Sequence, residues 1–409
     1  MKSRKLLMSL LLIPVLLMAA CSGTSLALNV PGLTAQVPTP AVEATAAPSV
    51  TQQALSSAET QSLADALAVL QDTFEQIYAR VNPSVVNIQV LETGAAGFGT
   101  QGGQSGLGSG FVWDRDGHIV TNAHVVEGAG QISVTFSDGF TVDAELVGAD
   151  QYSDLAVIKV DVDAGRLQPV ELADSNQVKV GQIAIAIGNP FGLQGTMTQG
   201  IISGLSRSLS VDADIALSQQ GGTYSIPDII QTDASINPGN SGGVLVDDQG
   251  RVIGVTAAIA STTRANSGVG FVIPSAIVQK VVPSLIVTGD VQHSWMGISG
   301  TTLTPDLAQA ANLPEDQQGV LVMSVTAGGP AEKAGILAGT REASIDGQRV
   351  PVDGDVIIAI DGQTVTRFED MVSYLYNQTD PGQTVTLTLL RQGSEQTIQL
   401  VLGALPNAS

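Results

Sequence analysis

Three residues that could act together as base, orienting acid and nucleophile occur in the order His124, Asp154 and Ser241. A serine hydroxyl is a weak nucleophile at neutral pH. It needs an imidazole to take its proton and a carboxylate to hold that imidazole in one tautomer. The sequence offers a candidate for each role, so these residue types predict nucleophilic acyl transfer.

Small residues surround the candidate nucleophile in the run Gly239–Gly243. Glycines let the backbone turn sharply, so the N–H groups of Gly239, Asn240 and Ser241 could converge on one point. Backbone N–H groups placed in this way stabilise the negative oxygen of a tetrahedral intermediate. We therefore expect the nucleophile and the oxyanion hole to lie in the same segment.

The letters around Ser241 also fit the G-x-S-x-G elbow of α/β-hydrolases, in which a helix follows the serine and the acid and histidine come later. Here Val244–Val246, Asp247–Gly250 and Val252–Val255 predict a strand, a turn and a strand instead. Only His293 follows Ser241, in a stretch expected between domains. An esterase of the elbow type is therefore disfavoured.

The chain of 409 residues carries 17 Lys and Arg against 38 Asp and Glu, a net charge of −21. This charge would repel a phosphate backbone, so no nucleic-acid partner is expected. The histidines His118, His124 and His293 are far apart and Cys21 is the only cysteine, which leaves no ligand spacing for a metal. We expect no metal or other cofactor, with His118 on a surface strand and His293 in a linker.

Residues 1–21 have the pattern of a secretion signal, in which the basic segment Lys2–Lys5 precedes the apolar run Leu6–Ala20. The small residues before Cys21 resemble a bacterial lipoprotein box, which implies lipidation of that cysteine; plain signal-peptidase cleavage is the alternative. Either interpretation places the mature protein outside the cytoplasm. Lipidation would anchor it to the outer face of the cell membrane. The single cysteine has no partner for an internal disulfide there.

Residues 22–62 are rich in Ala, Thr, Pro and Ser and carry almost no charge. Such a segment buries too little apolar surface to fold, so we predict a disordered tether. Apolar residues then recur at spacings of three and four from Leu63 to Tyr78, which predicts a helix ended by Asn82-Pro83. The apolar face of this helix needs a partner.

Short β-rich runs alternate with turn signals such as Asp116-Gly117 and Asp138-Gly139 from residue 85 to about residue 282. Many short strands with little helix indicate β-barrels rather than a parallel sheet. The segment Gly94–Gly110, mostly Gly, Gln, Ser and Ala, is predicted to be a mobile loop. The predicted strands are Val85–Val90, Gly110–Trp113, His118–Thr121, Ile132–Phe136, Val142–Val147, Leu155–Val160, Ile183–Ile187, Thr198–Ser203, Val244–Val246, Val252–Ala258 and Gly268–Val272.

A third unit begins near Gln292 and contains a helical stretch at Phe368–Tyr376 before a closing strand pair. Near its start, the backbone N–H groups of Met296, Gly297 and Ile298 could cap the terminal carboxylate of a peptide. The peptide would add a strand to the neighbouring sheet edge.

Three segments occur in the order typical of one family: Thr121–Val126, Asp154–Ile158 and Gln231–Gly243. Together with the third unit they resemble the HtrA/DegP family of secreted or periplasmic serine proteases. The resemblance implies an all-β-dominated fold, with a chymotrypsin-like double β-barrel and its N-terminal helix at 63–285. A PDZ domain, a β-sandwich with helices, would follow at 290–405.

The same resemblance implies that His124 is the general base, Asp154 its orienting carboxylate and Ser241 the nucleophile. It also implies an apolar specificity pocket for small aliphatic side chains, with Ile236 in its lining. A homotrimer is the assembly that the resemblance favours.

In the PDZ unit, the resemblance makes Trp295-Met296-Gly297-Ile298 the carboxylate-binding loop. The family usually has Tyr-Leu-Gly or a similar tripeptide there, so Trp295 is a departure that could alter pocket selectivity. The segment Gly339–Pro351 is interpreted as a short insertion, and the sequence offers no function for it.

These features favour an ATP-independent serine endopeptidase that degrades misfolded or exposed polypeptides, with the PDZ domain binding substrate C-termini. The alternative is a PDZ-containing chaperone or scaffold that does not cut. A scaffold would not need all three of His124, Asp154 and Ser241, so the sequence favours the protease.

Overall fold

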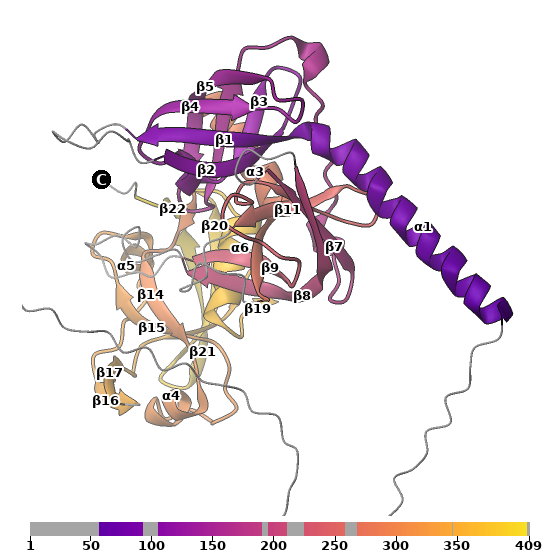
Figure 1. Ribbon diagram of the computed structural model, residues 1–409. Helices are drawn as coiled ribbons and strands as arrows, with labels where there is room; N and C mark the ends of the chain where they lie inside the picture. The colour runs from indigo at the N-terminus through magenta and orange to yellow at the C-terminus, as the bar shows by residue number, and fades with distance from the viewer. Residues whose placement is uncertain are drawn as a thin grey trace, which may run out of the picture. The chain divides into compact units, whose positions relative to one another are not determined.

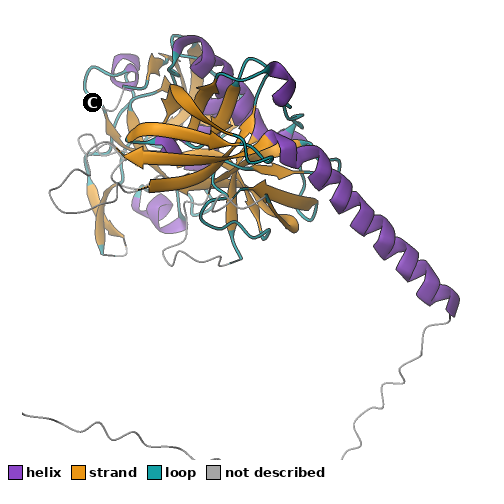
Figure 2. Ribbon diagram, turned by 45° about the horizontal axis from the view of Figure 1, so that its top comes forward, coloured by secondary structure: helices purple, strands orange, loops and turns teal. Residues whose placement is uncertain are grey.

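The computed structural model describes residues 57–92, 105–189, 195–210, 225–257, 268–345 and 347–406. The expected signal segment with Cys21, and the tether up to residue 56, lie outside these ranges. A compact unit extends from Ala58 to Ser409. Within the described residues, no helix is long and apolar enough to cross a membrane. Strands dominate the described chain (Figure 2).

Helix α1, Ser57–Val81, confirms the helix predicted from apolar spacing. It starts earlier than expected, so residues 57–62 are helical rather than part of the tether. Ala58 and Gln61 are good helix formers, although this polar turn gives no periodic apolar signal. Ile77 and Val81 are buried at the other end. The N-terminal half leaves apolar side chains exposed: Leu63, Leu67, Val69 and Leu70.

The first barrel closes through antiparallel pairs in the order β1–β2–β3–β6–β5–β4 (Figure 1). Its interior is filled by apolar side chains of the inward-facing positions. It confirms the strands predicted in this part of the sequence. The bounds are β1 Val85–Glu92, β2 Ser105–Val112, β3 His118–Thr121, β4 Ala129–Thr135, β5 Thr141–Asp150 and β6 Leu155–Val160.

Strand β2 corrects part of the expected loop Gly94–Gly110, since it begins at Ser105; residues 94–104 lie outside the described residues. The glycines here serve close packing. A Cβ at Gly108 would lie 2.5 Å from Val125 Cγ1, and a Cβ at Gly110 would lie 2.8 Å from Ile88 Cδ1. Glycine in a strand often marks such an approach, and composition alone does not separate it from a loop.

The second barrel closes in the order β10–β11–β12–β9–β8–β7. Strand β9 is not predicted from the sequence, because Pro227 and Asp228 interrupt its apolar pattern and Asp228 has φ +56. The remaining strands agree with the prediction to within a few residues, except that β8 is longer. The bounds are β7 Ile183–Gly188, β8 Thr196–Ser210, β9 Ser225–Thr232, β10 Val244–Val246, β11 Val252–Ala257 and β12 Gly270–Pro274.

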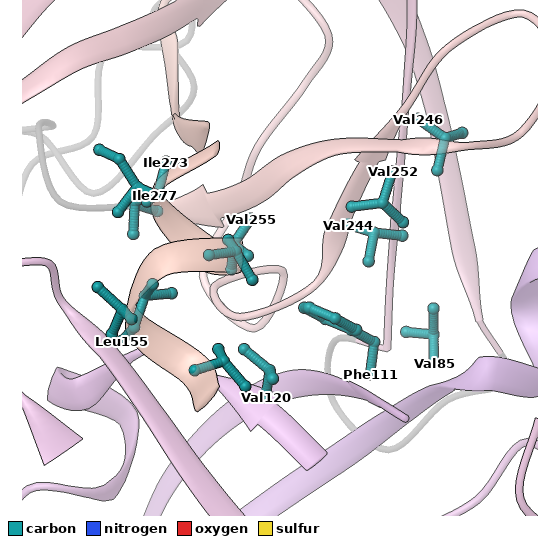
Figure 3. Packing of buried hydrophobic residues seen from close by; sticks show 14 of the residues in the cluster. Val85, Phe111, Val120, Leu155, Val244, Val246, Val252, Val255, Ile273 and Ile277 are labelled. Carbon is teal, nitrogen blue, oxygen red and sulfur yellow. The ribbon is translucent and has the colours of Figure 1, made fainter. Parts of the chain in front are cut away.

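A shared apolar core lies between the barrels, and helix α3, Ser275–Thr288, contributes to it. Figure 3 shows Phe111 and Leu155 of the first barrel in the same cluster as Val244 and Val255 of the second. The sequence does not predict α3, because its Ile and Val residues are typical of strands. Close packing of this core holds the facing barrel edges in fixed positions.

The third unit is built on a sheet in the order β14–β15–β18–β20–β21, in which β14 is an edge strand. Its helices pack on two apolar clusters of this sheet. The strands are β14 Ile298–Thr302, β15 Val320–Val325, β18 Val356–Ile360, β20 Thr384–Arg391 and β21 Ser394–Val401, with β19 Gln363–Thr364 beside β18. The helices are α4 Pro305–Ala310, α5 Pro330–Ala334 and α6 Phe368–Gln378.

Two small antiparallel pairs complete this unit. Strand β13, Ser294–Trp295, pairs with β22, Gly403–Ala404, and so joins the beginning of the unit to its end. Strands β16, Glu342–Ile345, and β17, Gln348–Pro351, form a hairpin inside the expected insertion.

Candidate active site

The ends of two paired strands bring His124 and Asp154 together. Strands β3 and β6 are antiparallel neighbours, with Thr121 opposite Ala156. His124 lies in the short helix α2, Ala123–Val126, directly after β3, and Asp154 immediately precedes β6. The register of one strand pair therefore places an imidazole and a carboxylate at the same barrel edge.

His124 Nδ1 lies 2.9 Å from each carboxylate oxygen of Asp154. One of these oxygens, Oδ1, also accepts the backbone N–H of His124 at 3.1 Å. The Asp154 side chain is 5% exposed and the His124 side chain 34%. An ionised carboxylate can only accept, so it keeps a proton on Nδ1 and leaves Nε2 free to take one. A general base needs this tautomer.

The backbone of Asp154 is also fixed. Its φ of +54 lies in the left-handed region, which is uncommon for a residue other than glycine. Its carbonyl accepts the N–H of Ala123 at 3.1 Å and the side-chain amide of Asn122 at 2.9 Å. These bonds tie the turn before β6 to the segment that carries His124.

The segment before Ser241 forms a type II turn over residues 237–240. The Asn240 N–H donates to the Asn237 carbonyl at 2.9 Å, Pro238 occupies the second position, and Gly239 has φ +96 at the third. Of the three expected oxyanion donors, the Asn240 N–H is therefore already engaged inside the turn, which leaves the N–H groups of Gly239 and Ser241. Between described residues, no hydrogen bond engages the N–H of Gly239 or Ser241.

Ser109 of β2 connects this turn to the first barrel, and sequence reasoning missed it. Its N–H donates to the Ser241 carbonyl at 2.7 Å, and its hydroxyl donates to the Gly239 carbonyl at 2.6 Å. The same hydroxyl accepts the Asn189 N–H at 2.8 Å, and the Thr121 hydroxyl donates to the Ser109 carbonyl at 2.7 Å. Ser109 therefore holds the carbonyl groups of Gly239 and Ser241 in place. Its glycine-rich surroundings resemble a loop and give no signal for this role.

Ser241 is thus placed across the barrel interface from the His124–Asp154 pair. It is 6% exposed, and no hydrogen bond between described residues joins its Oγ to His124. Strands β10 and β11 follow Ser241 in the chain, and no helix lies in the described stretch between Ser241 and Ala257. This arrangement excludes the elbow alternative.

Two other candidate residues lie in the second barrel. Ile236 is buried, and its Cδ1 would lie 2.7 Å from a Cβ at Gly270, so a side chain there would displace it. Asp233 accepts the Ile201 N–H at 2.7 Å and so joins the segment before Ser241 to β8.

The candidate peptide-binding loop is held in place by backbone hydrogen bonds. The Met296 carbonyl accepts the Ala331 N–H at 2.9 Å, and the Gly297 carbonyl accepts the Thr326 N–H at 2.8 Å. Gly297 has φ +79. The loop leads into the edge strand β14, which begins at Ile298, and the free side of this strand is where a peptide could add.

The other two histidines differ from expectation. His118 is in a strand, as predicted, but it is buried rather than on the surface, and its Nδ1 lies 2.7 Å from Asp114 Oδ2. His293 lies between α3 and β13, yet it is also buried, with its Nε2 2.9 Å from Asp150 Oδ2. In the part of the chain that the structure describes, no group of three or more His, Cys, Asp or Glu residues could hold a metal ion.

Two barrels with a histidine–aspartate pair and a serine segment at their interface define a trypsin-like peptidase fold. A PDZ unit follows this fold in the chain. Residues 108–255 match the trypsin-like peptidase domain family and residues 294–402 match the PDZ domain family. The solved structure of the HtrA-type protease AlgW with a tripeptide is 35% identical, covers 82% of this chain and 98% of its own, and has a TM-score of 0.65. The chain belongs to the HtrA family, as its motifs predict.

Named relatives agree with this family. Protease Do-like 1, chloroplastic, of Arabidopsis thaliana is 42% identical over 304 residues, which are 74% of this chain and 65% of that protein. A probable periplasmic serine endoprotease, DegP-like, of Brucella suis biovar 1 is 39% identical over 300 residues, or 73% of this chain and 53% of that protein. The chain therefore spans between about half and two thirds of the length of these curated relatives.

Proposed function

We propose that this chain is an ATP-independent serine endopeptidase that cuts misfolded or exposed polypeptide segments. The observation that carries the proposal is the buried Asp154 carboxylate, 2.9 Å from His124 Nδ1, opposite a serine that directly follows a type II turn. The alternative, a scaffold that does not cut, would have no use for this pair. Names of DegP-like serine endoproteases among its relatives support the same activity.

In the proposed mechanism, His124 Nε2 takes the proton of Ser241 Oγ as that oxygen attacks the scissile carbonyl carbon. Asp154 stays ionised and stabilises the imidazolium. The N–H groups of Gly239 and Ser241 receive the oxyanion of the tetrahedral intermediate. His124 then gives its proton to the leaving amine, and water, activated by the same imidazole, releases the acyl group. Ile236 would favour small aliphatic side chains beside the cut bond.

The PDZ unit would bind substrate C-termini. A peptide would pair with the free side of β14, and the N–H groups of Met296, Gly297 and Ile298 would cap its carboxylate. The Trp295 ring lies against Gly297 of this loop, since its Cη2 would be 3.3 Å from a Cβ at Gly297. The related AlgW structures contain a tripeptide or a decapeptide, which supports peptide binding here.

Location and assembly are part of the same proposal. Periplasmic relatives and the basic-then-apolar N-terminus support a site of action outside the cytoplasm, with Cys21 lipidated as the anchor. Two acyl chains would hold the protein stably, whereas one alone is marginal. The exposed apolar residues of α1, such as Leu63 and Leu67, support association into a homotrimer.

Fluorophosphonate labelling of the intact protein tests the proposed activity. The reagent reacts with an activated serine, so it should attach to Ser241 and to no other residue, and Ser241→Ala should remain unlabelled. Casein digestion should be seen with the wild type and be absent from Ser241→Ala. Label at another serine, or casein cleavage by Ser241→Ala, would refute the assignment, and a folded wild type that neither reacts nor cuts would favour the scaffold.

Replacing Gly297 by alanine should weaken binding of peptides with a free apolar C-terminus by about tenfold, equivalent to ~1.4 kcal/mol. Its φ of +79 disfavours a side chain, and the added Cβ would lie 3.2 Å from Pro330 Cδ, in the loop that must approach the carboxylate. Titration into full-length protein carrying Ser241→Ala measures the affinity without cleavage.

The control for this prediction is Gly382→Ala, which has φ +88 and no atom within 4 Å of the added Cβ. It tests the cost of the backbone conformation away from the loop and should bind the peptide normally. An amidated peptide should bind the wild type weakly. Equal affinity for the acid and the amide would exclude carboxylate capture.

A further inference from the structure

A buried hydrogen-bonded pair, His293 and Asp150, joins the segment after α3 to the strand that leads to Asp154. His293 Nε2 lies 2.9 Å from Asp150 Oδ2, and the two side chains are 7% and 3% exposed. The residues are 143 positions apart in sequence. Removing two such polar side chains from water costs free energy. This cost is offset only when their other hydrogen-bonding atoms also find partners.

The Asp150 carboxylate uses that capacity on the turn between β5 and β6. Its Oδ1 accepts the N–H of Tyr152 at 3.1 Å. Its Oδ2 accepts both the N–H and the hydroxyl of Ser153, at 3.2 and 2.5 Å. The next residue is Asp154, whose left-handed backbone is unfavourable unless its surroundings impose it. Asp150 is therefore bonded to both residues that precede the triad carboxylate.

The segment that carries His293 is packed against β5. A Cβ at Gly148 would lie 2.5 Å from the Gly289 carbonyl oxygen, so this part of β5 needs glycine to let the segment pass. The His293 carbonyl also accepts the N–H of Leu405 at 2.8 Å. The segment is thus held against β5 at Gly289 and bonded to Leu405 at His293 itself.

Two aromatic rings fix the orientation of the imidazole. Tyr376 of α6 stacks on His293 with ring centroids 4.9 Å apart and an interplanar angle of 28°. Tyr152 meets it edge-on at 5.6 Å and 75°. Burial, together with the negative charge of Asp150, raises the pKa of the Tyr152 hydroxyl. The imidazole therefore has little freedom to turn away from the carboxylate.

Helix α6 is itself fastened to the protease part. Lys280 of α3 donates to the carbonyls of Tyr376 and Thr379, the latter at 3.1 Å, and burial lowers the pKa of this lysine. Asp228 of β9 accepts hydrogen bonds from Ser373 and from the Asn377 amide, the second at 2.6 Å. The ring that stacks on His293 is thus held in place from two other elements.

We propose that Asp150 and His293 are positioning residues for Asp154: the carboxylate of Asp150, held by His293, keeps the turn in the conformation that aims Asp154 at His124. This inference rests on the proposed function. It connects the linker residue His293 to Asp154 through residues 150–154.

The test compares His293→Ala with His293→Gln in the full-length protein. The amide of glutamine can donate to Asp150, whereas alanine cannot. Alanine should lower kcat for a short chromogenic peptide about tenfold with KM unchanged, since small displacements of a catalytic group have effects of this size or larger. Glutamine should recover most of the loss. The rate of fluorophosphonate labelling should follow kcat.

His118→Ala is the matched control, because His118 is also buried and also bonded to an aspartate, Asp114, at the far end of β3 from His124. It should change thermal stability without changing kcat. If His293→Ala does not fold, Asp150→Asn, which has the same shape, replaces it and should also lower kcat.

The inference is overturned by a folded His293→Ala with wild-type kcat, by glutamine that restores nothing, or by an equal loss in His118→Ala. Ser241→Ala in the same assay separates this result from the proposed function. If Ser241→Ala loses turnover and His293→Ala does not, only the positioning inference fails. If Ser241→Ala keeps turnover, the proposed function fails and the inference fails with it.

Discussion

Asp154→Asn is expected to lower kcat for peptide hydrolysis by about 10⁴-fold while the protein stays folded. The reason lies in the two bonds that the carboxylate accepts from His124, one from the backbone N–H at 3.1 Å and one from Nδ1 at 2.9 Å. An amide oxygen in the Oδ1 position satisfies the backbone N–H. The amide nitrogen in the Oδ2 position then lies 2.9 Å from Nδ1 and donates to it, which moves the imidazole proton to Nε2. In that tautomer His124 cannot take the proton of Ser241.

Asp143→Asn is the control for this change. Asp143 lies in β5, where its side chain accepts hydrogen bonds from Gln131 and Ser133 on the exposed surface, so replacing it by an amide should leave kcat unchanged. Steady-state kinetics and thermal melts of both variants provide the measurement. More than a few percent of wild-type kcat in a folded Asp154→Asn would show that the carboxylate does not orient the base.

The proposed triad could be placed from the sequence because each candidate residue lies next to a strand that the sequence also predicts. His118–Thr121 and Leu155–Val160 are predicted with the bounds that the structure has, and these strands pair. Once they pair, His124 and Asp154 must lie at the same edge. The family motifs add the role of Ser241, and the comparisons confirm the family.

What the sequence could not show depends on contacts between distant residues. Ser109 lies in a glycine-rich stretch whose partners, the carbonyls and N–H groups of Gly239, Ser241 and Asn189, come from the other barrel. The burial of His293 likewise depends on an aspartate 143 positions away. Propensity and periodicity are local signals, so they carry no information about such pairs.

Gly242→Ala is expected to destabilise the protein by about 2–4 kcal/mol and to lower kcat by about 10³-fold or more in the protein that still folds. Gly242 has φ +82, and an added Cβ would lie 2.1 Å from the Ser109 carbonyl oxygen and 2.4 Å from Thr121 Oγ1. These two atoms are hydrogen-bonded to each other and belong to the first barrel, so they cannot move without opening the interface between the barrels.

The activity loss has the same origin as the instability. If the turn moves away from Ser109 to relieve the contact, it carries Ser241 and the N–H groups of the oxyanion site with it. Loss of one oxyanion donor alone costs about 10²–10³-fold in kcat, and here the nucleophile is displaced as well. The Gly242 result should therefore differ from Ser241→Ala, which removes one hydroxyl and leaves the thermal melt almost unchanged.

Gly181→Ala separates the cost of the backbone conformation from the cost of the contact. Gly181 has φ +89, and no atom lies within 4 Å of its added Cβ. It should lose only about 1 kcal/mol of stability and keep the wild-type kcat. Denaturant unfolding and kinetics of the two variants measure both effects. Equal losses of stability in Gly181→Ala and Gly242→Ala, or a normal kcat in Gly242→Ala, would show that close packing of the barrels at Ser109 does not hold the nucleophile in place.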